Sequence, residues 1–196
     1  PTVPVEQGTG PSLEVLPFRA AAGYDTTRLA YRISSNELRF YAYHKWTAEP
    51  AVLVNEMVTN HLRASGQFAY VGRGTKGQDP DGYLAGTLVA LEEIDAGDSW
   101  KARIALRLEL RLGKSDKVLK RHGFDVTVSC KERHPRDVAR AISEALANEM
   151  KTLAPDLAKA ILAATTASEP AAEPAIPQPE PAPAETVNDG ASGQSK

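Results

Sequence analysis

The sequence has one cysteine in 196 residues and no long run of apolar residues. A single cysteine excludes a disulfide within the chain and a zinc site built from cysteines. Cys130 follows Val126 and Val128 at the two-residue period of a strand, so we predict that its side chain faces the core. No stretch approaches the roughly 20 apolar residues that cross a bilayer, so we expect no membrane-spanning helix.

The chain also lacks an excess of positive charge, because its formal net charge is −2. A protein of this charge has no overall basic field that would release counterions from a phosphate backbone. The composition therefore argues against nucleic acid as the main partner. A local basic strip could still bind smaller anions.

Residues spaced for catalysis or metal binding are scarce. The histidines lie far apart and none forms the i, i+4 pair that puts two metal ligands on one helix face: His44, His61, His122 and His134. Gly72, Gly74 and Gly77 match a dinucleotide-binding pattern, but turn residues follow instead of the helix that would hold a pyrophosphate. No nucleophile has a recognisable neighbouring base, so we expect no enzyme activity, no cofactor and no metal ion.

An acidic run ends one predicted strand, and it contains Glu92, Glu93, Asp95 and Asp98. Paired carboxylates can act as acid and base or hold a cation. We favour a simpler interpretation, a solvated turn at the end of the strand.

The clearest pattern in the chain is the alternation of apolar and polar residues from 102 to 112. It predicts a strand with one buried face and one wet face. Residues 118–131 repeat the pattern after a turn at 113–116, which predicts a hairpin. The wet face of the first strand carries three arginines: Arg103, Arg107 and Arg111. Guanidinium groups bind phosphate and carboxylate oxygens, so lipid head groups or an acidic partner are candidate ligands. The alternative, which we favour, is an ordinary exposed strand face.

The remaining elements follow from periodicity and turn residues. Further strands are predicted at Ser12–Phe18, Arg28–Ser34, Glu37–Trp46, Phe68–Val71 and Tyr83–Ile94. Residues 51–63 repeat apolar side chains with a helical period, and Gly66 is placed to cap that helix. Pro135 opens a longer helix, in which Pro155 should cause a kink or a restart.

These elements predict one α+β domain over residues 12–165, with a mainly antiparallel β-sheet covered by two helices. Residues 1–11 contain three prolines and two glycines, so we expect a flexible leader. Residues 166–196 are rich in proline, alanine and glutamate. Because they have little apolar surface to offset the entropy of ordering, they should form a disordered tail.

Two aromatic residues before the first predicted helix, Tyr43 and Trp46, are candidate partner contacts. Aromatic side chains often anchor protein interfaces, because they offer a large apolar surface with few rotatable bonds. The alternative, which we favour for Trp46, is that the side chain packs beneath the helix.

Three segments carry a family resemblance. The first comprises Leu13–Phe18, Tyr24–Asp25 and Leu29–Arg32. The second is the stretch Tyr-His-Lys-Trp-Thr-Ala-Glu-Pro at residues 43–50. The third runs from Gly86 through the alternating strand to Phe124 and ends with Val138–Leu146. Together these segments resemble the ABC-type transport auxiliary lipoprotein family, which accompanies mammalian-cell-entry (MCE) lipid-transport systems and the paraquat-inducible system.

The resemblance implies a non-enzymatic, periplasmic protein that is lipid-anchored at the outer membrane. It would work with an MCE-domain protein and an ABC permease and ATPase in lipid transport, with a homo-oligomer and phospholipid contact as further expectations. The lipidated cysteine would precede Pro1 and is absent from this chain. The alternative is a lipoprotein interaction module of another envelope system, such as an activator of cell-wall synthesis or a secretion component.

Overall fold

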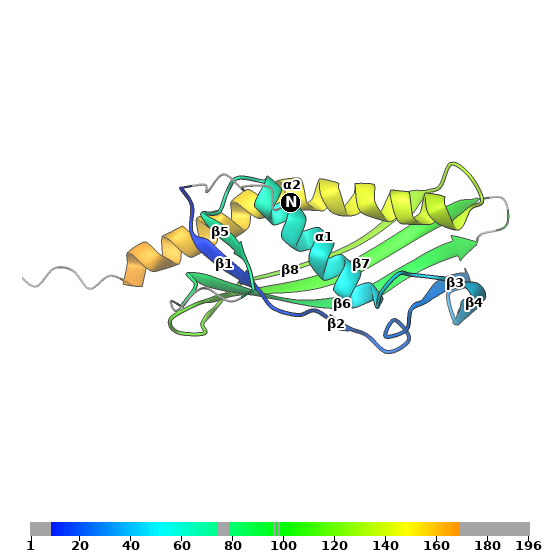
Figure 1. Cartoon of the computed structure of the whole chain (residues 1–196), viewed down its shortest axis with the longest axis horizontal. Helices are drawn as coiled ribbons and strands as arrows, with labels where there is room; N and C mark the ends of the chain where they lie inside the picture. Colours follow the sequence, from blue (N-terminus) through cyan, green and yellow to red (C-terminus); the bar gives the residue numbers. More distant parts are fainter. Residues whose placement is uncertain (1–8, 74–78, 96, 98, 169–196) are drawn as a thin grey trace, which may run out of the picture.

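A mixed β-sheet forms one layer of the molecule, and two helices lie across one of its faces (Figure 1). The computed structural model describes residues 9–73, 79–95, 97 and 99–168. In this part of the chain the elements are β1 Ser12–Val15, β2 Arg19–Ala20, β3 Arg28–Ser34, β4 Glu37–Lys45, α1 Pro50–Ala64, β5 Tyr70–Gly72, β6 Gly82–Asp95, β7 Trp100–Leu112, β8 Val118–Ser129 and α2 Pro135–Ser168. The predicted α+β class is therefore confirmed.

The long strand β6 organises the sheet. One of its edges pairs antiparallel with β7, and β7 pairs antiparallel with β8. The other edge pairs in turn with β1, β2 and β3, all three in the parallel direction, while β4 extends the sheet antiparallel to β3. The long ladders are antiparallel, as predicted, and the parallel pairing of the short N-terminal strands is a feature that the sequence pattern did not indicate.

The main core lies between the sheet and the two helices. Strand β7 supplies the alternating residues that the sequence predicted, and all of them are buried: Ala102, Ile104, Leu106, Leu108, Leu110 and Leu112. Helix α1 contributes Val54, Val58 and Leu62 to the same core. Each fully buried aliphatic side chain stabilises the fold by about 1.5–3 kcal/mol relative to an exposed one. Cys130 is half-buried and packs against this core, as expected from its strand spacing.

Helix α1 begins with Pro50, whose fixed φ suits a first helical position. It ends before Gly66, which has a φ of +67°, a conformation that glycine adopts without steric cost. Asn55 on the buried face of α1 donates a hydrogen bond of 2.8 Å to the carbonyl oxygen of Leu16. This bond fixes α1 against the segment that follows β1.

Helix α2 runs without interruption across the sheet, although Pro155 lies inside it. The sequence predicted a kink or a restart at this proline: no restart is observed, whereas the ribbon of α2 bends along its length (Figure 1). Proline cannot donate to the carbonyl of Lys151, which costs the helix one hydrogen bond. Buried residues on both sides of Pro155, among them Leu153 and Leu157, hold the helix on the core and compensate for the loss.

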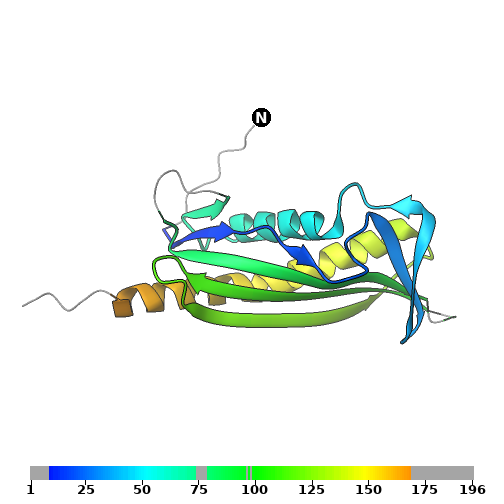
Figure 2. The same ribbon diagram turned by 90° about the horizontal axis from the view of Figure 1, so that it is seen from below.

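The two ends of the molecule carry different elements, as two perpendicular views show (Figures 1 and 2). One end holds the start of β1, the short strand β5 and the end of α2, and the opposite end holds the β3–β4 hairpin. No helix in the described part of the chain is long and apolar enough to cross a membrane. The last turn of α2 includes residues 166–168, and the division of the chain into leader, domain and tail remains a prediction.

Candidate functional site

A β-bulge in β6 decides which acidic side chains face the helices. Leu88 and Ala90 pair with two consecutive residues of β7, Leu106 and Ala105. Val89, which lies between them, is therefore an extra residue in β6. Because side chains alternate along a strand, one extra residue reverses the faces of every residue that follows. Glu92 therefore turns to the helix-free face of the sheet, and Glu93 turns toward the helices.

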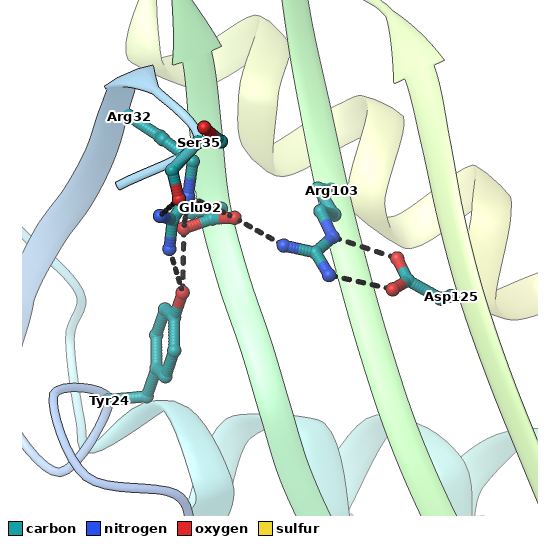
Figure 3. A network of polar contacts seen from close by, with 6 residues as sticks. All are labelled: Tyr24, Arg32, Ser35, Glu92, Arg103 and Asp125. Carbon is teal, nitrogen blue, oxygen red and sulfur yellow. Dashed lines mark hydrogen bonds and ion pairs between the residues drawn. The ribbon is translucent and has the colours of Figure 1, made fainter. Parts of the chain in front are cut away.

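Glu92 is the centre of a polar network on the helix-free face (Figure 3). Tyr24 donates a hydrogen bond of 2.6 Å to Oε2 of Glu92, while Arg32 and Arg103 donate to Oε1 at 3.0 and 2.8 Å. Arg103 also binds Asp125 through two hydrogen bonds of 2.8 and 2.6 Å. The network thus connects β3, β6, β7 and β8 with the loop that precedes β3.

The partners of Glu92 keep its carboxylate charged. Burial by itself raises the pKa of this carboxyl, but the hydrogen bonds from Arg32, Tyr24 and Arg103 outweigh burial and lower the pKa below its usual range. Burial, together with the hydrogen bond to Glu92, raises the pKa of Tyr24 to about 12, so its phenol remains a donor. A carboxylate with three donors is poorly suited to accept a proton from a substrate, and we interpret the network as structural.

The prediction that the acidic run forms a solvated turn is wrong for its first two members. Glu92 and Glu93 are both 0% exposed, because β6 continues through them to Asp95. Asp95 lies at the end of the strand, where its Oδ1 is 3.9 Å from Arg133. Asp98 lies outside the described residues.

Glu93 lies on the helix-facing side in a different environment. Tyr41 donates a hydrogen bond of 2.9 Å to its Oε1. Among the described residues, its Oε2 has no hydrogen-bond partner, and neither has the buried indole nitrogen of Trp46. Burial raises the pKa of Glu93 more than the bond from Tyr41 lowers it, and Asp95 raises it further. Folding therefore makes this carboxyl a weaker acid than it is in the unfolded chain.

The two aromatic candidates, Tyr43 and Trp46, occupy different environments. Trp46 is half-buried and packs against the main core, which is the interpretation that the sequence favoured. Its backbone amide donates a hydrogen bond of 2.7 Å to the carbonyl of Thr27. The side chain of Tyr43 is 94% exposed. Only Tyr43 is therefore available to a partner in this conformation.

The three candidate arginines of β7 lie on the helix-free face, but their surroundings differ. Arg103 is held in the network of Glu92. Arg111 pairs with Glu109 at 2.6 Å and with Asp116 at 2.9 Å. Arg107, between them, is exposed and forms no ion pair or hydrogen bond with any described residue. Of these three arginines, Arg107 alone has guanidinium N–H groups without a partner among the described residues.

An open groove of about 1150 Å³ extends along the helix-free face beside Arg107. We call it the helix-free groove, and its lining includes Phe18, Arg19, Tyr83, Thr87, Arg107 and Gly123. Sequence reasoning missed Arg19 and Thr87. Arg19 and Thr87 come together because β2 pairs in parallel with β6. A strand of two residues is too short to show an alternation of apolar and polar side chains, so the sequence did not indicate this pairing.

Other candidate sites do not assemble in the described residues. No group of three or more His, Cys, Asp or Glu side chains there could hold a metal ion. The ring of His44 packs edge-on against Tyr41, and Nε2 of His122 lies 3.9 Å from Glu149. Two glycines of the dinucleotide-like pattern, Gly74 and Gly77, lie outside the described residues.

The model of one protein family, the ABC-type transport auxiliary lipoprotein component, matches residues 1–154. The match covers more than half of the sequence, so this chain belongs to the family of ABC-type transport auxiliary lipoprotein components. The resemblance found in the sequence is confirmed. Membership associates the chain with ABC transport systems and, as a lipoprotein family, with the periplasmic side of the cell envelope.

Solved structures show the same fold at low sequence identity. Protein XCC0632 from Xanthomonas campestris is 22% identical, with a TM-score of 0.72 over 84% of this chain and 93% of that chain. A second structure, of an uncharacterized protein, is 12% identical, with a TM-score of 0.65 over 74% of this chain and 92% of that chain. Identities this low establish the fold alone.

A weaker likeness connects the chain to a PelC dodecamer from Paraburkholderia phytofirmans, at 14% identity and a TM-score of 0.49 over 77% of this chain and 90% of that chain. A likeness of this size carries no argument about how the present chain assembles. No curated protein matches the chain.

Proposed function

We propose that this protein is a non-enzymatic periplasmic lipoprotein component of an MCE-type ABC transport system that moves lipid between membranes. The observation that carries the proposal is the family match over residues 1–154. Its partners would be an MCE-domain protein and the ABC permease and ATPase. The buried, fully bonded carboxylate of Glu92 and the inaccessible carboxyl of Glu93 support a role without catalysis.

A lipid anchor at the outer membrane is part of this proposal. A lipidated cysteine before the leader would hold the protein at the membrane surface. One acyl chain binds a membrane only marginally, whereas two or more hold a protein stably. The leader, residues 1–11, would then separate the folded domain from the lipid head groups.

The arrangement of the molecule supports a partner contact at the β3–β4 hairpin. The described chain begins near β1 and β5, at the end opposite to this hairpin (Figures 1 and 2). An anchor that precedes β1 would therefore leave the hairpin at the far end of the domain. Tyr43 on β4 is almost completely exposed there, and exposed aromatic side chains are frequent anchors of interfaces.

Site-specific crosslinking in living cells tests this function. A photo-crosslinking amino acid would replace Tyr43 in the lipid-anchored protein, and a matched control would replace Lys159, an exposed residue in the C-terminal part of α2. We expect the probe at position 43 to capture the MCE-domain protein and the probe at 159 not to capture it. Capture of a cell-wall synthase or a secretion component at position 43 would instead support the alternative envelope role.

A further inference from the structure

Three polar side chains form a row across the helix-free face. In the ladders of the sheet, Arg19 of β2 is the partner of Thr87 of β6, and Thr87 is the partner of Arg107 of β7. Paired residues point to the same face, and adjacent strands lie about 4.8 Å apart. The two arginines therefore stand about 10 Å apart at their α-carbons, on either side of the threonine hydroxyl.

The donors of these two arginines are open. Arg19 and Arg107 are exposed, and neither forms an ion pair or hydrogen bond within the described residues. The neighbouring cations on the same face differ, because Arg103, Arg111 and Arg121 are each paired with a carboxylate at 2.9 Å or less. Positive charge without a partner is thus concentrated at the row formed by Arg19, Thr87 and Arg107.

The next residue of the row leaves space beside Arg107. Gly123 of β8 is the ladder partner of Arg107, and it has no side chain. A Cβ at this position would come no closer than 3.8 Å to any other heavy atom, so the space above it is open. An oxyanion could therefore approach the Arg107 guanidinium from this side without a clash.

An apolar wall continues the groove away from the charged row. Leu16 and Pro17 line it from the segment between β1 and β2, and Tyr83 and Ala85 line it from β6. The groove thus joins a polar end with two free guanidinium groups to an apolar strip along the same strand.

We propose that the helix-free groove binds an anionic phospholipid, with the phosphate between Arg19 and Arg107 and the first part of an acyl chain along Leu16 and Tyr83. Guanidinium groups bind phosphate oxygens through paired, charge-assisted hydrogen bonds, and Thr87 adds a hydroxyl donor. The apolar strip removes methylene groups from water at about 0.8 kcal/mol each. The inference deepens the proposed transport function and rests on it for the choice of a lipid over other anions.

Titration with monomeric ligands tests the site on the 196-residue chain. Short-chain phosphatidylglycerol below its micelle concentration, inorganic phosphate and the uncharged amphiphile octyl glucoside would each be added, with binding followed by calorimetry and by backbone amide shifts. We expect the phospholipid to bind at least about tenfold more tightly than either other ligand, because only it can use both ends of the groove. Amide shifts should concentrate around Arg19, Thr87 and Arg107.

Two variants locate the binding. Arg19→Ala combined with Arg107→Ala should weaken phospholipid binding about tenfold or more, because each arginine supplies charge-assisted bonds. Gly123→Val leaves every charge in place and fills the space beside Arg107, so it should also weaken binding. Arg39→Ala, which removes an exposed arginine of the β3–β4 hairpin, is the matched control and should change nothing. Unfolding midpoints near that of the parent chain would show that each variant is folded.

Several results would overturn the inference. If inorganic phosphate bound as tightly as the phospholipid, the groove would be a site for free anions and not for lipid. If octyl glucoside bound as tightly as the phospholipid, charge would have no role in binding. Unchanged phospholipid binding in both groove variants would place the lipid elsewhere. None of these results concerns the crosslink from Tyr43 to an MCE-domain protein, so the failure of this site and the failure of the proposed function can be told apart.

Discussion

Two adjacent glutamates show how strongly local geometry decides the chemistry of a residue. The bulge at Val89 sends Glu92 to one face of the sheet and Glu93 to the other. Glu92 meets three donors and has a lowered pKa, whereas Glu93 meets one donor among the described residues, Tyr41, and has a raised pKa. Both are fully buried, so their effects on stability should be measurable and opposite in their dependence on pH.

Replacement of Glu92 should destabilise the fold at neutral pH. Glu92→Gln leaves Arg32 and Arg103 without their buried counter-charge, and we expect a loss of about 3 kcal/mol in the free energy of unfolding. The loss should shrink as the pH falls below the ordinary glutamate value, because protonation removes the same charge from the parent chain. Urea unfolding at pH 7 and at acidic pH measures both effects.

Glu109→Gln is the matched control for Glu92→Gln. Glu109 also pairs with two arginines, Arg111 and Arg121, but Arg121 is largely exposed. An ion pair that is open to water contributes at most about 1 kcal/mol. Equal losses for the two variants at neutral pH would contradict the view that Glu92 is the centre of a buried, stabilising network.

Replacement of Glu93 should have the opposite dependence on pH. Because its pKa is raised in the folded state, folded Glu93 holds a proton that the unfolded chain releases. The parent chain should therefore lose stability as the pH rises from the ordinary glutamate value through the raised one, while Glu93→Gln keeps the neutral group and should lose less. The difference in unfolding free energy between the two chains should grow over this window.

An exposed glutamate provides the comparison for Glu93. Glu56→Gln on the outer side of α1 removes a carboxylate that lies in water. Its stability relative to the parent chain should not follow the trend of Glu93→Gln. If the stabilities of the parent chain and of Glu93→Gln changed in parallel over this window, the raised pKa of Glu93 would be contradicted.

At the scale of elements, the turn of the β7–β8 hairpin packs closely against the loop before β6, and one added methyl group should disrupt this contact. Gly113 follows β7, and its amide donates a hydrogen bond of 2.9 Å to the carbonyl of Asp81. A Cβ at Gly113 would lie 1.6 Å from the carbonyl oxygen of Pro80, a backbone atom that cannot move without the preceding loop. We expect Gly113→Ala to lower the free energy of unfolding by about 1–3 kcal/mol.

The same hairpin offers the control for this change. Gly123→Ala adds the same methyl group where the nearest atom is 3.8 Å away. A surface substitution of this kind should change stability by no more than about 0.5 kcal/mol. Chemical denaturation measures the free energy of unfolding of both variants. A Gly113→Ala variant as stable as Gly123→Ala would contradict the prediction, because the loop before β6 would then move aside at no cost in stability.

Elements with many repeated contacts were predictable from the sequence. The alternation in β7 and the helical periods of α1 and α2 are long enough to reveal the buried faces. The bulge at Val89 was not predictable, because one extra residue within an apolar run leaves no signal until its partner strand is known. The candidate site was only half predictable for the same reason. Arg107 belongs to the long alternation of β7, whereas Arg19 lies in a two-residue strand whose pairing with β6 leaves no pattern in the sequence.

At the scale of the whole molecule, three surfaces have separate roles in this account. The helices cover one face of the sheet and complete the core, the opposite face carries the helix-free groove, and the β3–β4 hairpin presents Tyr43 at one end. A domain anchored before β1 would present its hairpin to a transporter partner while the groove remained open along the side. This division of surfaces fits an accessory protein that contacts a transporter without catalysing a reaction.

We infer that the chain serves an MCE-type ABC transporter, and quantitative affinity purification of the protein from its host tests this inference. The lipid-anchored protein would be extracted from its host's envelope in mild detergent, and co-purifying proteins would be compared with those of an unrelated lipoprotein and of Tyr43→Ala. We predict that an MCE-domain protein, its permease and its ATPase co-purify in a fixed ratio with the parent protein and less with Tyr43→Ala. Absence of all three, with a cell-wall synthase or secretion component in their place, would contradict the account.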